Sequence, residues 1–257
     1  MLPVHKSLEP FVKDIVLLES DDKDREHVFP FYADGYAGVV YSKSENPFYL
    51  QPRNKQLSDF YLYGQTIEPI SLNVKGPFKS IILRMYPFAS RILLGIDPKI
   101  LNDDCYDLLL LDNIDTLGTV KRLRQTENKQ ELVNILANYF NELLKVASIN
   151  PDYRIKLATN LILKSNGAIS IKEVRDKLCV AERTLERHFL KEIGVTAKQF
   201  AKMIQFSTSL NQITDADYLN LTEIGFDSGF ADQSHFIRTF KRYTGKTPKE
   251  FQAQVSF

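Results

Sequence analysis

The carboxy-terminal part of the chain carries one residue pattern twice, and this repeat restricts the fold more than any other feature of the sequence. The segment "SIKEVRDKLCVAERTLERHFLKEIGVTAKQF" spans residues 170–200, and "NLTEIGFDSGFADQSHFIRTFKRYTGKTPKEF" spans residues 220–251. Matching positions of the two copies hold similar residues, namely Leu185 and Phe236, Phe189 and Phe240, Arg187 and Arg238, Gly194 and Gly245, and Phe200 and Phe251. Such self-similarity indicates one supersecondary unit built twice.

Each copy is predicted to be two short helices joined by a tight turn. A serine, threonine or asparagine stands three residues before a glutamate or glutamine at four helix starts, which are Ser170 and Glu173, Thr196 and Gln199, Asn220 and Glu223, and Thr247 and Glu250. This is the spacing of a capping box, in which each side chain bonds the other residue's backbone N–H. A glycine suited to a left-handed backbone follows the second helix of each copy. The layout is that of a helix-turn-helix.

The second helix of each copy combines an apolar face with a polar one. Phe236 and Phe240 are four residues apart and share a face that can anchor the helix in a core. The residues that fall mainly elsewhere are Gln233, Ser234, His235, Arg238 and Arg242, and in the first copy Arg183, Thr184, Glu186 and Arg187. Glutamine and arginine can bond base edges in a major groove, while Arg, Lys, Ser and Thr can hold phosphates. One such helix would be an ordinary solvated surface, but two matched copies favour nucleic-acid binding.

Residues 154–255, and "GFADQSHFIRTFKRYTGKTP" in particular, resemble the DNA-binding domain of the AraC/XylS family of bacterial transcription regulators. The resemblance implies an all-α, homeodomain-like domain of seven helices, with a long helix near residues 197–213 between two helix-turn-helix units. Their recognition helices would enter successive major grooves about 34 Å apart. It implies base-reading roles for Arg183, Glu186, Arg187, Gln233, Ser234, His235 and Arg238. It also implies that Thr184, Thr239, Lys241 and Arg242 contact phosphates or serve the structure.

The chain departs from the family pattern at several positions. Arg175 and Gly225 stand where the family usually has an alanine, and Ala181 stands where a serine usually caps the first recognition helix. Losing that cap costs about 1 kcal/mol. Gln205 and Gln252 replace common arginines, which predicts fewer phosphate contacts. The charge agrees, because residues 151–257 hold 16 Lys and Arg against 12 Asp and Glu, a modest net charge of +4.

The amino-terminal half is expected to be β-rich, with helices at its end. The runs "AGVVYS", "DFYLYG", "IEPISLNV" and "KSIILRMY" are rich in strand-forming residues and are separated by Pro, Gly and Asn. Residues 120–146 have apolar residues at helical spacing with a break near residues 127–130, which predicts one or two amphipathic helices. Their apolar stripe fits either packing within the domain or a dimer interface. Asn150 and Pro151, with Asp152 as N-cap, mark the predicted boundary between domains 1–150 and 151–257.

The segments "LEPFVKDIVLLES", "YGQTIEPISL", "ILRMYPFASRILLGI" and "DLLLLD" resemble an uncharacterised sensor-like domain found ahead of such DNA-binding domains. The aromatic residues of this half include Phe29, Phe31, Tyr32, Tyr36, Tyr41, Phe60, Tyr61 and Tyr63. They fit either a pocket for a small molecule or the core of a β-rich domain.

Other classes of function have no support in the sequence. The four histidines and the two cysteines, Cys105 and Cys179, lack metal-ligand spacing, and no phosphate loop or nucleophile elbow occurs, so we expect no metal, no cofactor and no enzymatic activity. No long apolar run and no secretory signal are present, which predicts a cytoplasmic protein that does not bind membranes. We expect an α+β protein that regulates transcription by binding double-stranded DNA. A small molecule or formation of a homodimer could control it through residues 1–150.

Overall fold

The computed structural model describes residues 2–112, 114–147, 152–215 and 220–255. The chain divides into two compact units. The sheet unit comprises Met1–Pro30, Tyr36–Gly64 and Ile70–Pro151, and the helical unit comprises Phe31–Gly35, Gln65–Pro69 and Asp152–Phe257. Two short segments of the amino-terminal half therefore group with the helices. The predicted boundary at Asn150 and Pro151 lies outside the described residues and stays a prediction.

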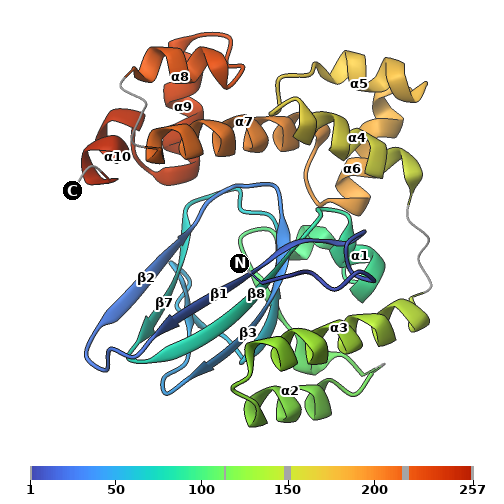
Figure 1. Cartoon of the computed structure of the whole chain (residues 1–257). Helices are drawn as coiled ribbons and strands as arrows, with labels where there is room; N and C mark the ends of the chain where they lie inside the picture. The colour runs from blue at the N-terminus through green and yellow to red at the C-terminus, as the bar shows by residue number, and fades with distance from the viewer. Residues whose placement is uncertain (1, 113, 148–151, 216–219, 256–257) are drawn as a thin grey trace. The chain divides into compact units, whose positions relative to one another are not determined.

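The sheet unit is built on two β-sheets (Figure 1). Its strands are β1 (Val12–Ser20), β2 (Glu26–Phe31), β3 (Ala37–Ser44), β4 (Tyr49–Gln51), β5 (Lys55–Gln56), β6 (Phe60–Tyr63), β7 (Ile70–Lys75), β8 (Phe78–Met85) and β9 (Cys105–Asp107). One sheet has the order β1-β8-β3-β6-β9, and the other has the order β2-β7-β4-β5. The β-rich prediction is confirmed, and the four strand runs named from the sequence correspond to β3, β6, β7 and β8.

Periodicity in the sequence did not predict strand β1. The strand forms by pairing with β8, which lies far along the chain. It pairs antiparallel with β8, and Asp14 lies opposite Arg84. Arg84 donates two hydrogen bonds to the Asp14 carboxylate, from Nε over 2.7 Å and from Nη2 over 2.5 Å. A bidentate pair of this kind is stronger and more specific in geometry than a single bond. Pairing with β8 therefore defines β1 as a strand, although its own sequence does not alternate between apolar and polar residues clearly enough to predict it.

Short helices and two long ones complete the sheet unit. They are α1 (Ala89–Leu94), the 3-10 turns η1 (Pro98–Leu101) and η2 (Leu108–Leu110), α2 (Thr116–Gln125) and α3 (Lys129–Val146). Helices α2 and α3 lie side by side (Figure 1), and their break falls where the sequence predicts it. The apolar stripe of α3 is buried within the unit, where Tyr139 packs on Phe60 of β6 with 5.2 Å between ring centroids. Packing within the domain therefore explains the stripe.

The helical unit has seven α-helices among its described residues, as the resemblance implies. They are α4 (Tyr153–Lys164), α5 (Ile171–Leu178), α6 (Glu182–Glu192), α7 (Ala197–Thr214), α8 (Leu221–Asp227), α9 (Gln233–Thr244) and α10 (Pro248–Val255). Asp152 caps α4 by accepting from the Arg154 N–H over 2.9 Å, as predicted. None of the described helices combines the length and apolar character that crossing a membrane requires.

Capping interactions set the starts of these helices. Ser170 and Glu173 form a reciprocal capping box at α5, and Thr196 and Gln199 form another at α7. At α10 the hydroxyl of Thr247 and the carboxylate of Glu250 make the same exchange. The side chain of Asn220 bonds only the Thr222 N–H, over 3.0 Å. Helix α6 starts at Ala181 with no side-chain cap, as the sequence predicts.

Candidate nucleic-acid interface

The first helix-turn-helix consists of α5 and α6. Leu185 and Phe189 of α6 are buried, with exposed fractions of 2% and 0%, and they anchor the helix as predicted. The turn between the helices passes through Cys179, whose φ of 52° is in the left-handed region. Arg175, which replaces a small family residue, does not disturb the packing. Its Nη1 lies 3.1 Å from Oε2 of Glu182 and ties α5 to α6.

The second helix-turn-helix consists of α8 and α9 and turns through Gly229, with a φ of 78°. Phe236 and Phe240 are buried on one face of α9, with 5.8 Å between their ring centroids. Gly225 of α8 faces this cluster, and a Cβ on it would lie 3.1 Å from Cδ1 of Phe236. Even an alanine methyl group at residue 225 would be crowded, so glycine lets α8 and α9 approach closely.

Within the helical unit, helix α7 joins the two helix-turn-helix units. Helices α4 and α6 contact α7 on one side, and α8, α9 and α10 contact it on the other, so that the two helix-turn-helix units lie toward opposite ends of α7 (Figure 1). The helix has 18 residues, which corresponds to a length of about 27 Å at 1.5 Å per residue. Successive major grooves on one side of B-DNA are about 34 Å apart. A connector of this length gives the two units a separation comparable to one turn of DNA.

The outward face of α9 carries most of the residues predicted for the second unit. Gln233, Ser234, Arg238, Lys241 and Arg242 are exposed. Thr239 is different, because it is buried with an exposed fraction of 7%, which supports the structural alternative for this residue. The exposed set has two arginines, one lysine and one glutamine, the side chains that hold phosphates and read purine edges.

His235 lies half-buried at the beginning of α9. Its ring packs edge-on against Phe230, with 5.4 Å between centroids. Burial lowers the pKa of His235, and the positive charges of Lys202, Arg238 and Lys198 lower it further. A neutral imidazole offers one donor and one acceptor, which suits contact with a base edge or a phosphate.

Lys198 and Lys202 of α7 were not among the predicted site residues. Their influence on His235 shows that α7 adds positive charge beside the amino-terminal end of α9. Lys198 is exposed and Lys202 is half-buried. The basic residues near α9 therefore come from two helices. Residue spacing within α7 gave no signal for this, because only the packing of α7 against α9 brings these lysines close.

The first unit exposes only part of its predicted set. Arg183 and Arg187 of α6 are exposed, and Thr184 is half-buried. Glu186 turns inward, where the Ala197 N–H at the start of α7 donates to its carboxylate, while its Oε2 is buried without a hydrogen-bond partner. Burial raises the pKa of Glu186. This environment favours a structural role for Glu186, and the arginines are the stronger candidates for base reading.

His188, on the same helix, is also used within the unit. Its Nδ1 lies 2.6 Å from Oδ2 of Asp152, the residue that caps α4. This contact fixes α6 against the start of α4. Two of the polar residues of α6, Glu186 and His188, therefore hold the helix in place, and Arg183 and Arg187 are the exposed charges among its predicted site residues.

The aromatic residues of the amino-terminal half belong mostly to the core. Tyr41, Phe60, Tyr61 and Tyr63 are buried, and the remaining members, Phe29, Phe31, Tyr32 and Tyr36, are half-buried. Tyr41 also lines a small cavity, and its hydroxyl is buried without a hydrogen-bond partner. Core packing thus accounts for much of the aromatic content, and Tyr41 also borders a small cavity.

Two helix-turn-helix units on one connecting helix make this chain a double helix-turn-helix protein. Residues 174–254 match the family model of a helix-turn-helix domain, and residues 1–107 match a domain of unknown function (DUF6597). The helical part of the chain is a helix-turn-helix domain of the AraC type. The helix-turn-helix model covers most of α5 and all of α6 to α9, and so both helix-turn-helix units.

Known proteins extend the comparison over most of the chain. The transcriptional activator RhrA of Rhizobium meliloti (strain 1021) is 24% identical over 241 residues, which cover 85% of this chain and 74% of RhrA. The HTH-type transcriptional activator RhaS of Escherichia fergusonii is 28% identical over 85 residues, 33% of this chain and 30% of RhaS. Among solved structures, ToxT from Vibrio cholerae covers 95% of this chain and 99% of its own, with a TM-score of 0.54 and 15% identity. The chain shares the ToxT fold, a β-rich part followed by a helical part.

Proposed function

We propose that this protein is a transcription regulator that binds double-stranded DNA in a sequence-specific manner through both helix-turn-helix units. The observation that carries the proposal is the pair of recognition helices, α6 and α9, on the two sides of α7. Each is anchored by buried apolar residues and exposes arginines. Binding, with no bond made or broken, is the whole of its chemistry, and we propose neither an enzymatic activity nor a cofactor.

In this proposal, recognition is divided between bases and phosphates. Arg183 and Arg187 of α6 and Gln233, Ser234, His235 and Arg238 of α9 read base edges in successive major grooves. Lys241 and Arg242 hold phosphates, and Thr184 does so at the first unit. The exposure of Arg183, Arg187, Arg238 and Lys241 supports these roles. Glu186 and Thr239 support the helices from inside.

We further propose that the sheet unit controls DNA binding in response to a small molecule. Support comes from the fold shared with ToxT, which has been solved bound to (E)-4-(8-methylnaphthalen-1-yl)but-3-enoic acid, with a TM-score of 0.51 to this chain. The alternative is that the sheet unit acts as a dimerisation module without an effector. A small molecule that raises the melting temperature supports the first, and self-association without any ligand response supports the second. We place the regulator in the cytoplasm, where its DNA target lies.

The experiment that tests the proposal is a binding selection on randomised duplex DNA with the full-length protein. It is run at two salt concentrations, because non-specific binding depends steeply on salt. We expect two enriched base clusters about one helical turn, or roughly 34 Å, apart. A single cluster would mean that only one unit reads bases, and no enrichment at either salt concentration would refute sequence-specific binding.

A further inference from the structure

Two lysines on neighbouring strands of the sheet unit face each other. Lys43 of β3 and Lys79 of β8 are direct partners in the antiparallel register. Like charges directly opposite each other on neighbouring strands are destabilising. The position between them is therefore suited to an anion.

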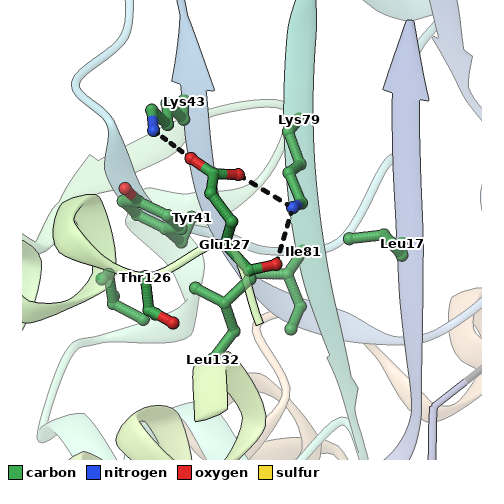
Figure 2. Close-up of a pocket in the computed structure, with 9 residues that line it drawn as sticks. Leu17, Tyr41, Lys43, Lys79, Ile81, Thr126, Glu127 and Leu132 are labelled. Carbon is green, nitrogen blue, oxygen red and sulfur yellow. Dashed lines mark hydrogen bonds and ion pairs between the residues drawn. The ribbon is translucent and has the colours of Figure 1, made fainter. Parts of the chain in front are cut away.

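One carboxylate of the chain occupies this position. The Lys43 ammonium donates to Oε1 of Glu127, and Lys79 donates to Oε2 over 3.1 Å and to the Glu127 carbonyl over 3.2 Å (Figure 2). Glu127 belongs to the link between α2 and α3 and is itself 66% exposed. These contacts hold the pKa of Glu127 below its usual value. The ammonium groups of Lys43 and Lys79 thus both bind the exposed Glu127 carboxylate, which lies in the short link between α2 and α3.

The surroundings of this carboxylate resemble a ligand site. Beneath it lies a cavity of about 10 Å³ with apolar walls that include Ile81, Leu123 and Leu132, and Tyr41 borders it with a side chain only 3% exposed. The Tyr41 hydroxyl has no hydrogen-bond partner. On the other side of the carboxylate, a groove of about 400 Å³ opens to solvent, which is within the usual size range of ligand sites. Lys43, Lys79 and Glu127 line both spaces.

Charges around the groove select the kind of anion. Its wall includes Glu19, Asp21 and Glu45 in addition to Glu127. Glu19 is paired with Lys129 over 3.0 Å. Such a rim repels a phosphate dianion or a polyanion more strongly than a molecule with one carboxylate and an otherwise uncharged body. Pro77 and Phe78, which also line the groove, offer the uncharged part an apolar contact.

We propose that Lys43 and Lys79 form the binding site for the carboxylate of a small monocarboxylic acid, and that Glu127 occupies this site when no ligand is bound. The ligand displaces Glu127 and so releases the link between α2 and α3. The inference rests on the proposed function, because it places the effector site of the regulator. It also predicts competition: Glu127 and the ligand need the same two ammonium groups.

The test measures binding of propionate, which copies the end of a glutamate side chain, to the full-length protein by ligand-observed NMR. Propionamide is the uncharged control, and sodium chloride keeps ionic strength constant. Glu127→Gln removes the competing charge, so we expect propionate to bind this variant about tenfold more tightly than the unsubstituted protein, a change of the size that one charge-assisted contact gives. The double variant Lys43→Gln with Lys79→Gln should not bind propionate. Glu142→Gln, which changes an exposed carboxylate of α3 that pairs with Lys145 over 2.6 Å and lines neither space, is the matched control and should leave the affinity unchanged within about twofold.

A structural ion pair without a ligand role gives a different pattern. The inference is overturned if Glu127→Gln gains no affinity, if propionamide or chloride competes equally, or if binding persists without the two lysines. Specific DNA binding is measured on the same samples. If the unsubstituted protein shows no specific DNA binding without propionate, the proposed function is refuted. If it binds DNA specifically but does not bind propionate, only this site is refuted.

Discussion

Residues predicted to read bases take different positions in the two recognition helices. Arg238 of α9 is exposed and free to meet a base, whereas Glu186 of α6 turns toward the start of α7 and accepts from the Ala197 N–H. Both were predicted to read bases from the outward positions of a helical pattern. The difference arises because α7 passes close to α6, so that one side of α6 that looks polar in the sequence is covered in the fold.

Arg238, one of the two exposed arginines of α9, is expected to carry sequence information. Arg238→Ala should weaken binding to the selected site by about 1–3 kcal/mol and relax base preference at one position. Lys241→Ala is the control, since losing a phosphate contact should weaken all sequences equally and reduce the salt slope by about 1. Both are measured by equilibrium titration against specific and scrambled duplexes. Equal weakening on all duplexes by Arg238→Ala would rule out its base-reading role.

The inward-facing glutamate should affect stability and leave recognition alone. Burial raises the pKa of Glu186, so the folded state holds its proton more tightly than the unfolded state, and folding is opposed at pH values above the usual glutamate range. Glu186→Gln should therefore be at least as stable as the unsubstituted protein at pH 7, and its advantage should disappear as pH falls through the glutamate range. Denaturant midpoints between pH 4 and pH 7 measure this. A changed base preference in the selection experiment would contradict the structural role.

At the scale of elements, helix starts show how local sequence determines structure. Three complete capping boxes form as predicted at α5, α7 and α10. Each depends on a side chain and a backbone amide three residues away, so distant parts of the chain have little influence on it. The α6 start lacks a cap at Ala181 and remains helical because Leu185 and Phe189 are buried.

Restoring the missing cap should stabilise the first helix-turn-helix. Ala181 has φ −68° and ψ 151°, the extended geometry of an N-cap. Ala181→Ser should raise the free energy of unfolding by about 0.5–1 kcal/mol, since its hydroxyl can accept from an amide in the first turn of α6. The denaturant midpoint reports the change. Ala231→Ser, at the exposed residue before the existing cap Asp232, is the control and should change stability little.

At the scale of the whole molecule, α7 connects the two helix-turn-helix units at a defined separation, so that they can bind DNA together. Its length is fixed at about 27 Å, because each residue of an α-helix adds 1.5 Å along the axis. The units therefore cannot adjust to an arbitrary spacing of their base clusters. The protein should therefore recognise the distance between the two base clusters as well as the bases within them.

Five base pairs inserted between the two enriched clusters should abolish simultaneous binding. Half a helical turn puts the second major groove on the opposite side of the duplex. The contacts of one unit are then lost, at about 1–3 kcal/mol for each bidentate base contact. Titration of the protein against duplexes with the insertion inside or outside the site measures this. Equal affinity for both duplexes would show that the units bind independently.

The sequence by itself determined the features that depend on neighbours a few residues apart. These are the repeated helix-turn-helix, most of the helix starts, the break between α2 and α3, and the strands with clear turn residues around them. Tertiary structure alone decided features that join distant segments. The pairing of β1 with β8 sets Asp14 against Arg84, and α7 turns Glu186 inward and brings Lys198 and Lys202 toward His235. The convergence of Lys43 and Lys79 on Glu127 belongs with them. Local signals act through a side chain and its own backbone, whereas strand register and helix packing depend on burial by segments far along the chain, which periodicity within one segment cannot specify.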